Sequence, residues 1–454
     1  MKGPFPILFL FIAHLAFFAS CTLPTQPDRA QRISEILENI SPPRFAERTI
    51  SALDYGVQAD SSFDSQPAIN EAIKMLSDSG GGTLLFPKGN YHCKGPILLD
   101  NDIHLHFEDG TTLSFSQDPA DYLPLQLVRW EGIECYNYSP YIYAMHKKNI
   151  AITGQVIFDA QAAGGLANWR ILQNPDKDLL RLYGKEQKPL EKRIFGEGHH
   201  LRMSFIQLMH CENILIEDIE ITNVPFWVIH PTYCNNLTIR NVHIDSYSIN
   251  NDGIDVDSSE DVLIENCTFR AGDDAVVIKS GRDQDGWRVN KPSRNIVIRN
   301  CFASEVLHGL AFGSEMSAGL EHIYVDNFHM KYVQQYAIQF KSNPDRGGYI
   351  RNVSIDGIFI DDAQTAIFFT NDYHSYSGGN APSVFSDITI SNVVCNQARE
   401  MAIDIKGLSH KPIQSIELKN IMVKREGEKS TIRHVMLSQF SNITIDQHAA
   451  NFEP

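Results

Sequence analysis

From residue 211 onward, one short pattern of apolar and polar positions recurs along the chain. Each copy begins with polar residues, continues with alternating apolar positions and has a turn-forming Asn, Asp or Gly in the middle, as in ENILIEDIEI and EDVLIENCTF. Equivalent positions lie 23 to 35 residues apart, at Asn213, Asn236, Asp261, Asn295, His322, Asn352, Asp387, Ser415 and Asn442. Repeats of this length, built from two or three short strands without long helices, predict an all-β solenoid of stacked parallel strands.

A second set of strands lies between these copies. Six segments share one alternation: GIDVDS (253–258), AVVIKS (275–280), GLAFGS (309–314), AIQFKS (337–342), AIFFTN (366–371) and AIDIKG (402–407). Their second and fourth positions are apolar, so we expect these side chains to point into the solenoid and the others to point outward. Because neighbouring parallel strands lie roughly 4.8 Å apart, equivalent outward residues should form ladders up one face.

The outward ladders of the first four strands concentrate charge on one surface. The residues just before these strands are Asp252, Asp274, His308 and Tyr336. The outward positions along them are Asp255, Val277, Ala311 and Gln339, followed by Asp257, Lys279, Gly313 and Lys341. Like charges at this spacing are destabilising unless a function uses them. We therefore expect a functional site on this face.

Paired carboxylates of this kind suit the hydrolysis of a glycosidic bond. One carboxyl group must be protonated and the other ionised, and the two stand roughly 6.5–9.5 Å apart when the ionised group activates water. Crowding pushes the pKa values of neighbouring carboxyl groups apart, which supplies an acid and a base at one pH. The same residue types would also fit turns that cap strand ends, or a calcium site. Residue types alone leave these interpretations open.

The formal net charge of −16 over 454 residues restricts the partners. No basic stripe is available to replace the counterions of a phosphate backbone, which argues against a nucleic-acid partner. A polyanionic substrate would also be repelled at long range. Such a substrate must be met by local cations in a cleft.

The N-terminus has the features of an export signal. Lys2 precedes FPILFLFIAHLAFFAS, an apolar run too short to span a bilayer as a helix, which ends in small residues before Cys21. We expect residues 1–20 to be a signal peptide. FFASC resembles the lipobox of bacterial lipoproteins, which would make Cys21 the lipidated first residue, and the alternative is an ordinary cleaved signal with a chance Cys.

The mature chain should then begin with a tether. Residues 21–48 are polar and contain proline, with one short helix expected around AQRISEILENI, and the catalytic domain should occupy residues 49–454. The helix expected at 66–77, with Pro67 in its first turn, should cap the N-terminal end of the solenoid. The protein is expected to be exported, to the periplasm or as an outer-membrane lipoprotein of a bacterium. Any membrane contact would be through the lipid anchor.

No metal or organic cofactor is required by the sequence. The seven cysteines after Cys21 show no CxxC or Cys/His metal spacing, so no structural zinc site is expected. The export signal permits disulfides, but their pairing stays open.

Several motifs on and around the charged face resemble those of glycoside hydrolase family 28, the polygalacturonase family. They are NNDGID (250–255), GDD (272–274), LHG (307–309) and QFK (339–341). The resemblance covers about residues 50–445, and RWEGIECYNYSPYIYA, GEGHHLR, FWVIHP and NPDRGGYIRNV are similar to its exo-acting bacterial branch. It implies an inverting hydrolase of α-galacturonosidic linkages in pectin, on a single right-handed parallel β-helix.

The resemblance also implies roles for the catalytic residues. Asp273 would be the general acid, while Asp252 and Asp274 would together activate the attacking water. His308 would hydrogen-bond within the carboxylate cluster and help to keep the acid protonated.

Substrate binding is implied at five further positions. Arg282 and Lys341 would contact a uronate carboxylate, with Lys279 on the same face. His230 is a further candidate, for which a purely structural role is the alternative. Gln339 stands where the family usually has Arg, and Leu307 where it has Gly. Since Gln cannot supply the charged fork of Arg, we expect a substrate other than plain polygalacturonate near Gln339, such as a rhamnogalacturonan fragment.

Two other functions are alternatives to hydrolysis. A pectic polysaccharide lyase would need a clear basic proton abstractor, and a non-catalytic surface glycan-binding protein would not need the carboxylates and His308 together. Exo or endo action depends on the segment at about 116–205, which contains NWRILQ and LLRLYGKEQKPLEKR. We expect it to fold over the groove and close one end, and the alternative is a solvated insertion loop.

Overall fold

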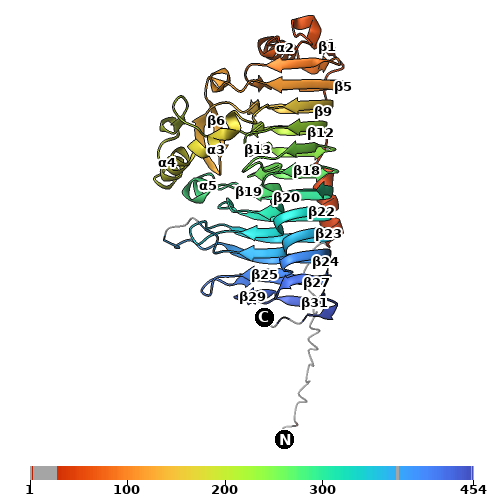
Figure 1. Cartoon of the computed structure of the whole chain (residues 1–454), viewed down its shortest axis with the longest axis vertical. Helices are drawn as coiled ribbons and strands as arrows, with labels where there is room; N and C mark the ends of the chain where they lie inside the picture. The colour runs from red at the N-terminus through yellow and green to blue at the C-terminus, as the bar shows by residue number, and fades with distance from the viewer. Residues whose placement is uncertain (1–2, 4–27, 375–377, 451, 453–454) are drawn as a thin grey trace.

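Parallel strands stacked coil upon coil form the body of the protein (Figure 1). The computed structural model describes residues 3, 28–374, 378–450 and 452. The strands of the main stack are β1 (Thr49–Ser51), β2 (Gly82–Phe86), β3 (Asn90–Cys93), β4 (Ile97–Leu98), β5 (Ile103–Phe115), β8 (Ile142–Met145), β9 (Lys148–Asp159), β11 (Ile206–Met209), β12 (Glu212–Thr222), β13 (Ile229–Thr232), β14 (Asn235–Arg240), β15 (His243–Ser246), β16 (Ile254–Asp257), β17 (Glu260–Glu265), β18 (Thr268–Ala271), β19 (Asp274–Lys279), β20 (Ser293–Ala303), β21 (His308–Phe312), β22 (Leu320–Lys341), β23 (Tyr349–Thr370), β24 (Val384–Met401), β25 (Ile403–Lys406), β27 (Ile416–Val423), β28 (Glu426–Glu428), β29 (Thr431–Arg433), β31 (Gln439–Ile445) and β32 (His448–Ala449). The fold is all-β, as predicted.

The remaining elements are small. A side sheet contains β6 (Gln126–Trp130), β7 (Ile133–Asn137) and β10 (Ile194–Phe195), and a separate pair contains β26 (Ile413–Gln414) and β30 (Val435–Met436). The helices are α1 (Arg29–Asn39), α2 (Gln66–Asp78), α3 (Trp169–Leu172), α4 (Asn174–Lys185) and α5 (Asp283–Val289), with short 3-10 turns η1 (Ala52–Tyr55), η2 (Pro119–Tyr122), η3 (Leu166–Asn168) and η4 (Leu190–Lys192). No helix in the described part of the chain is long and apolar enough to cross a membrane.

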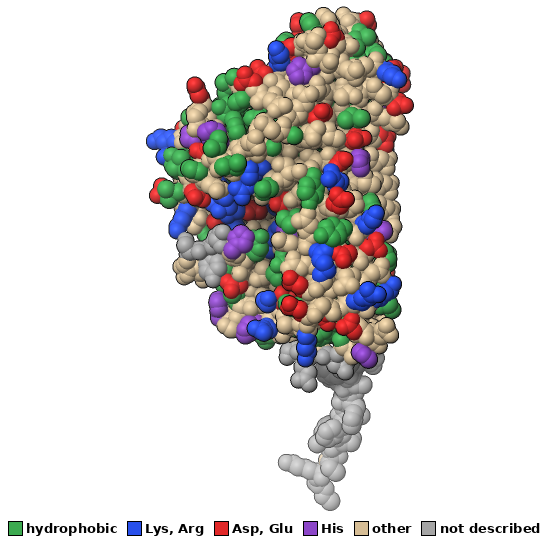
Figure 2. All heavy atoms as spheres, viewed as in Figure 1, with side chains coloured by type: hydrophobic (Ala, Val, Ile, Leu, Met, Phe, Trp, Pro, Cys, Tyr) green, Lys and Arg blue, Asp and Glu red, His purple; other side chains and the backbone are tan. Residues whose placement is uncertain are grey.

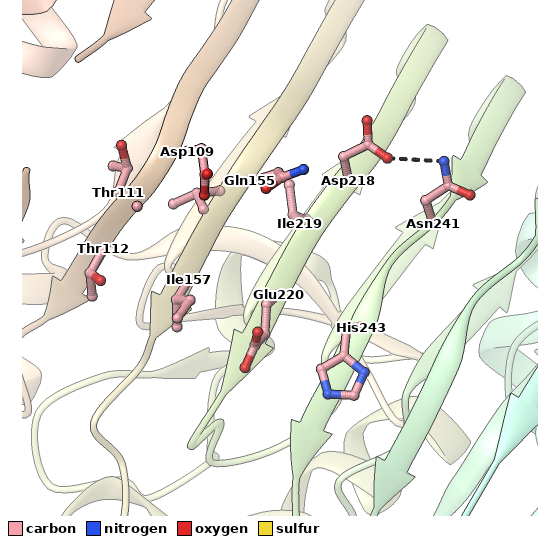
Figure 3. Close-up of a pocket in the computed structure, with 12 residues that line it drawn as sticks. Asp109, Thr111, Thr112, Gln155, Ile157, Asp218, Ile219, Glu220, Asn241 and His243 are labelled. Atoms are coloured by element: carbon pink, nitrogen blue, oxygen red, sulfur yellow. Dashed lines mark hydrogen bonds between the residues drawn. The ribbon is translucent and has the colours of Figure 1, made fainter. Parts of the chain in front are cut away.

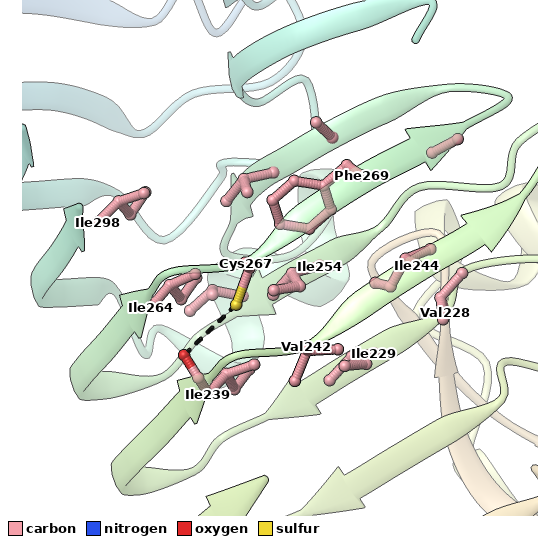
Figure 4. Close-up of a cluster of buried hydrophobic side chains, with 14 of the residues drawn as sticks. Val228, Ile229, Ile239, Val242, Ile244, Ile254, Ile264, Cys267, Phe269 and Ile298 are labelled. Atoms are coloured by element: carbon pink, nitrogen blue, oxygen red, sulfur yellow. Dashed lines mark hydrogen bonds between the residues drawn. The ribbon is translucent and has the colours of Figure 1, made fainter. Parts of the chain in front are cut away.

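The predicted register of the charged-face strands is confirmed. Ile254 pairs with Val276, and the same row continues through Leu310 and Ile338 to Ile367. These side chains are fully buried in the apolar interior (Figure 4 shows the neighbouring part of it). Successive side chains of a strand point to opposite faces and only one face is turned to the interior, so apolar positions alternate with outward ones in the sequence.

The turn residues of the repeat are also found where expected, with one correction. The positions from Asn213 to Ser415 all have left-handed backbones, a conformation that Asn and Asp tolerate. Asn442 does not continue this row, because its neighbours pair with those of Asn420, to which its side-chain amide donates at 2.8 Å. Both turns of a coil carry Asn before an alternating run, so the pattern alone fitted either one.

The first two helices of the chain, α1 and α2, pack against different parts of the stack. α2 lies at the N-terminal end in Figure 1 and buries Ile69, Ile73 and Leu76 against the first coils. α1 forms where the short helix was expected within residues 21–48. It packs Ile36 against Val297 and other outer-face residues, so this part of the segment is bound to the body instead of being a solvated tether.

The segment at 116–205 is not one insertion, contrary to expectation. Its middle returns to the stack as β8 and β9, because Ile142–Met145 and Lys148–Asp159 carry the same alternation as the coils. Two excursions remain, one carrying β6 and β7 and one carrying α3, α4 and β10, and they meet in the side sheet.

Buried ion pairs attach these excursions to the stack. Arg129 in β6 lies 2.9 Å from Asp257 at the end of β16, and both side chains are fully buried. Arg193 lies 2.7 Å from Asp285 in α5, which is also buried. Removing one partner of such a pair leaves an uncompensated charge at a cost of about 3–5 kcal/mol, so the excursions are held rigidly.

The seven cysteines of the described residues are buried thiols without disulfides.

Candidate active site

The row of charged residues predicted on four consecutive coils lies together in the structure. Asp252 precedes β16, Asp274 begins β19 and pairs in register with His308, the first residue of β21. The same face carries Lys279 from the end of β19 and Lys341 from the end of β22. All five line one pocket of about 430 Å³.

Asp274 is held as a carboxylate by its partners. Its oxygens lie 2.7 Å from His308 Nδ1 and 3.0 Å from Lys341 Nζ, and the residue is almost completely buried. Burial alone would raise the pKa of Asp274, but Lys341 and then His308 outweigh it and hold the pKa well below its usual value. These partners therefore favour the ionised form of Asp274.

Asp252 has the opposite environment. Burial, reinforced by the neighbouring charge of Asp255, raises the pKa of Asp252 well above its usual value, although Lys279 Nζ lies 3.2 Å away. Burial also raises the pKa of Asp255 to about 7, with Lys279 Nζ at 2.9 Å from its Oδ1. Neighbouring carboxyl groups with opposite pKa shifts are the pattern expected where one site needs both an acid and a base.

Asp273 is the carboxyl group that is most open to the pocket. Its side chain is 15% exposed, against 1% for Asp274, and it accepts a hydrogen bond from Asn250 Nδ2 at 3.2 Å. His308 Nδ1 lies 3.5 Å from it. Burial would lower the pKa of His308, but hydrogen bonds to Asp273 and Asp274 outweigh this and raise it.

The same residues have the spacing of metal ligands. Asp273, Asp274 and His308 each offer one ligand atom, and these atoms lie within 4.8 Å of one another. The ammonium group of Lys341 already contacts both oxygens of Asp274, at 3.0 and 3.3 Å. A metal ion would have to displace that group to bind Asp274.

Cations from the second excursion surround the pocket and were not identified from the sequence. Arg170 of α3 and Lys177 and Arg181 of α4 line it, and Figure 2 shows Lys and Arg side chains gathered around a hollow on this side of the molecule. The segment was expected to fold over the groove and close one end; three of its cations line the pocket, but they could not be placed individually without the fold. Together they supply the local positive charge that an acidic protein needs to bind a polyanion.

Other pocket residues connect the predicted ones. Arg282 forms an ion pair with Glu315. Burial would raise the pKa of Glu315, but the charges of Arg282 and Lys279 outweigh burial and hold that pKa well below its usual value. Lys279 Nζ lies 3.7 Å from the centre of the Trp227 ring. Glu315 and Trp227 were missed because neither lies in a repeated phrase of the sequence.

Two of the predicted substrate-binding residues do not reach the pocket. Gln339 is fully buried, as are Asp255, Val277 and Ala311 of the same outward row, so it cannot contact substrate. The row points outward as predicted, but other side chains cover it. His230 is fully buried as well, 2.9 Å from Gln207 Nε2 and 3.5 Å from Asp257, which is the structural role considered as its alternative.

A second groove of similar volume lies on another face and has the wrong charge for a polyanion. It runs across β5, β9, β12 and β15 and is lined by Asp109, Asp218 and Glu220 (Figure 3). Asp218 accepts a hydrogen bond from Asn241 Nδ2 at 2.9 Å. Acidic side chains repel an anionic ligand, and no Lys or Arg is among the described residues that line this groove, so the carboxylate pocket with its surrounding cations is the better site for one.

Comparisons with known proteins identify a family. Residues 194–442 match the model of glycosyl hydrolases family 28, and residues 49–114 match that of rhamnogalacturonase A/epimerase, pectate lyase-like. The chain is 27% identical over 410 residues to a probable polygalacturonase of Vitis vinifera, covering 87% of this chain and 78% of that one.

Solved structures are similar over most of the chain. A hyperthermoactive exopolygalacturonase from Thermotoga maritima superposes with a TM-score of 0.85 at 33% identity, covering 90% of this chain and 96% of that one. A family 28 exopolygalacturonase from Yersinia enterocolitica superposes with a TM-score of 0.70 at 21% identity, covering 89% and 76%, and supports the fold alone.

Proposed function

The chain belongs to glycosyl hydrolases family 28, and we propose that it hydrolyses α-galacturonosidic bonds with inversion in the pocket around Asp273. The observation that carries this proposal is the pair of neighbouring carboxyl groups in different environments. Asp274 is buried and ion-paired, whereas Asp273 faces the pocket. Carboxylate oxygens of Asp273 and Asp274 lie within 4.8 Å of each other, closer than the roughly 6.5–9.5 Å expected for an inverting pair, so the separation does not itself indicate inversion and the anomer released is the test. An ion-paired carboxylate beside an accessible carboxyl group provides a base and an acid for one bond.

In the proposed reaction, Asp273 donates its proton to the oxygen of the leaving sugar as the glycosidic bond breaks. A water molecule held by Asp274 and Asp252 attacks the anomeric carbon from the opposite side and gives its proton to Asp274. His308, within 3.5 Å of both Asp273 and Asp274, is placed to return a proton to the acid. The sugar oxygen, the water and both protons are thereby accounted for.

Uronate recognition follows from the cations around the carboxylates. Arg170, Lys177 and Arg181 line the pocket from α3 and α4, and Arg282 borders it. Exo action is supported by the Thermotoga maritima relative, which is an exopolygalacturonase. The reason for expecting a different substrate near Gln339 is gone because that residue is buried, so unbranched oligogalacturonate is the first substrate to test.

The wild-type protein should release galacturonic acid with inverted anomeric configuration from defined oligogalacturonates. Proton NMR during the first minutes of reaction would identify the anomer and show whether monomers appear alone, as exo action requires. Rhamnogalacturonan fragments form the parallel arm. An ultraviolet-absorbing unsaturated product would indicate a lyase, and binding of oligomers without any cleavage would indicate a glycan-binding protein.

We also propose the domain layout. Residues 49–454 would form one right-handed parallel β-helix capped by α2, whose apolar face is buried on the first coils. Residues 1–2, 4–20 and Cys21 lie outside the described residues, and the proposals of a signal peptide, a lipid anchor and export to the bacterial periplasm or outer membrane rest on the sequence. Expressed in a bacterium, the wild-type protein should be recovered with membranes and Cys21→Ser in the soluble fraction. Equal partitioning of the two would rule out the anchor.

A further inference from the structure

A cleft next to the catalytic pocket, distinct from the acidic groove of Figure 3, has no role in the proposed chemistry. It has a volume of about 650 Å³ and lies between α4, α5 and the loop around Asn380. Arg181 and Arg282 line both this cleft and the catalytic pocket. The two hollows are therefore neighbours that share a border of two guanidinium groups.

Trp287 of α5 is the large aromatic side chain of this cleft. It is 39% exposed, although burial of an indole is strongly favourable. Its Nε1 donates a hydrogen bond to the carbonyl of Arg346 at 3.0 Å. A Cβ atom on Gly347 would lie only 2.7 Å from the same Nε1, so the absence of a side chain there lets the loop pack against the ring.

The position of the ring is fixed by buried charges. Asp285 of the same helix pairs with Arg193 at 2.7 Å, and Asp283 pairs with the buried Arg346 at 3.0 Å. The indole therefore has little rotamer freedom to lose when a ligand packs on it, and a rigid aromatic group of this kind is a favourable binding surface.

We propose that this cleft is a binding subsite for a further uronate unit of the same substrate chain. The apolar ring face of the sugar would pack on Trp287, and its carboxylate would lie toward Arg181 and Lys185. The lining cations, which also include Arg282, outnumber the two lining carboxylates, Asp283 and Asp345. The inference rests on the proposed galacturonide hydrolysis. It adds that units remote from the bond that is cleaved contribute binding energy, so the enzyme discriminates by chain length.

The test is a chain-length series. Initial rates are measured on galacturonate dimers, trimers, tetramers and hexamers for the wild type, Trp287→Ala and Trp287→Phe. The wild-type kcat/KM should rise with length, and Trp287→Ala should reduce the hexamer-to-dimer ratio of kcat/KM roughly 10- to 100-fold, mainly through KM. Trp287→Phe loses the bond to Arg346 but keeps a ring, and should restore most of the ratio.

Phe359→Ala is the matched control. Phe359 is exposed to 37%, close to the value for Trp287, and lines neither cleft, so its removal should leave the ratio as in the wild type. A hexamer-to-dimer ratio that Trp287→Ala leaves unchanged would overturn the subsite, provided that its urea unfolding matches the wild type. If Trp287→Ala lowers the free energy of unfolding, the test rests on Trp287→Phe. A hexamer-to-dimer ratio of kcat/KM that stays low in Trp287→Phe would also overturn stacking on the ring. Failure of the wild type to cleave any oligogalacturonate would instead overturn the proposed function.

Discussion

Asp273→Asn should lower kcat on oligogalacturonate about a thousandfold, because the amide cannot protonate the leaving oxygen. Asn has nearly the same shape as Asp, so packing beside Asn250 should be preserved and KM should change little. The loss should be much smaller on an aryl galacturonide with a nitrophenol leaving group, which departs without acid assistance. Initial rates on both substrates measure this difference.

Asp245→Asn is the control for this substitution. Asp245 is a half-exposed carboxylate that pairs with Arg270 away from the pocket, and its loss should not affect kcat. If Asp273→Asn reduced kcat less than tenfold on the oligomer, or equally on both substrates, Asp273 would not be the acid.

Lys341→Met should abolish most activity below neutral pH and shift the acid limb of the kcat/KM profile upward. Lys341 opposes the effect of burial on Asp274, so its loss raises the pKa of that carboxyl group. A carboxyl group with a raised pKa is ionised less at any given pH, and the deficit in base grows as the pH falls. We expect kcat/KM to fall at least a hundredfold at pH 5 and less at pH 8, measured as a full pH profile.

The same change should lower the free energy of unfolding at pH 7. Because the pKa of Asp274 is lowered in the folded state, its ion pair contributes stability above the usual Asp pKa and loses it as the pH falls through the folded value. Breaking a buried pair costs about 3–5 kcal/mol, to be measured by urea unfolding. Lys74→Met, which removes an exposed pair with Asp78, should lower the free energy of unfolding far less. An acid limb that stays in place would contradict the role of Lys341.

The sequence predicted those parts of the site that depend on periodicity. The alternation of Ile254 and Val276 with their neighbours fixes which residues face outward, and the ladder of Asp252, Asp274 and His308 follows from register alone. A parallel stack repeats each position one strand spacing further on. Residues at equivalent positions of the sequence repeat are therefore neighbours in the structure.

Prediction failed where the burial or the position of a side chain is set by segments that are distant in the sequence. Gln339 faces outward, as its position in the strand requires, but the pattern contains no information on whether another layer covers that row. The pairing of Arg129 with Asp257 spans 128 residues and two separate pieces of the fold. Arg170 and Lys177 likewise reach the pocket from helices that have no repeat to fix their position.

The buried ion pairs of the two excursions also have a consequence for how the molecule unfolds. In a stack of repeats, each coil contacts mainly its neighbours, so stability is close to a sum of local terms and the ends can open independently. Arg129 and Arg193 break this rule, because they connect distant segments to the central coils through Asp257 and Asp285. The centre thereby becomes one cooperative unit while the terminal coils remain free to fray. Catalysis should therefore survive the loss of the last coils and end abruptly when the centre opens.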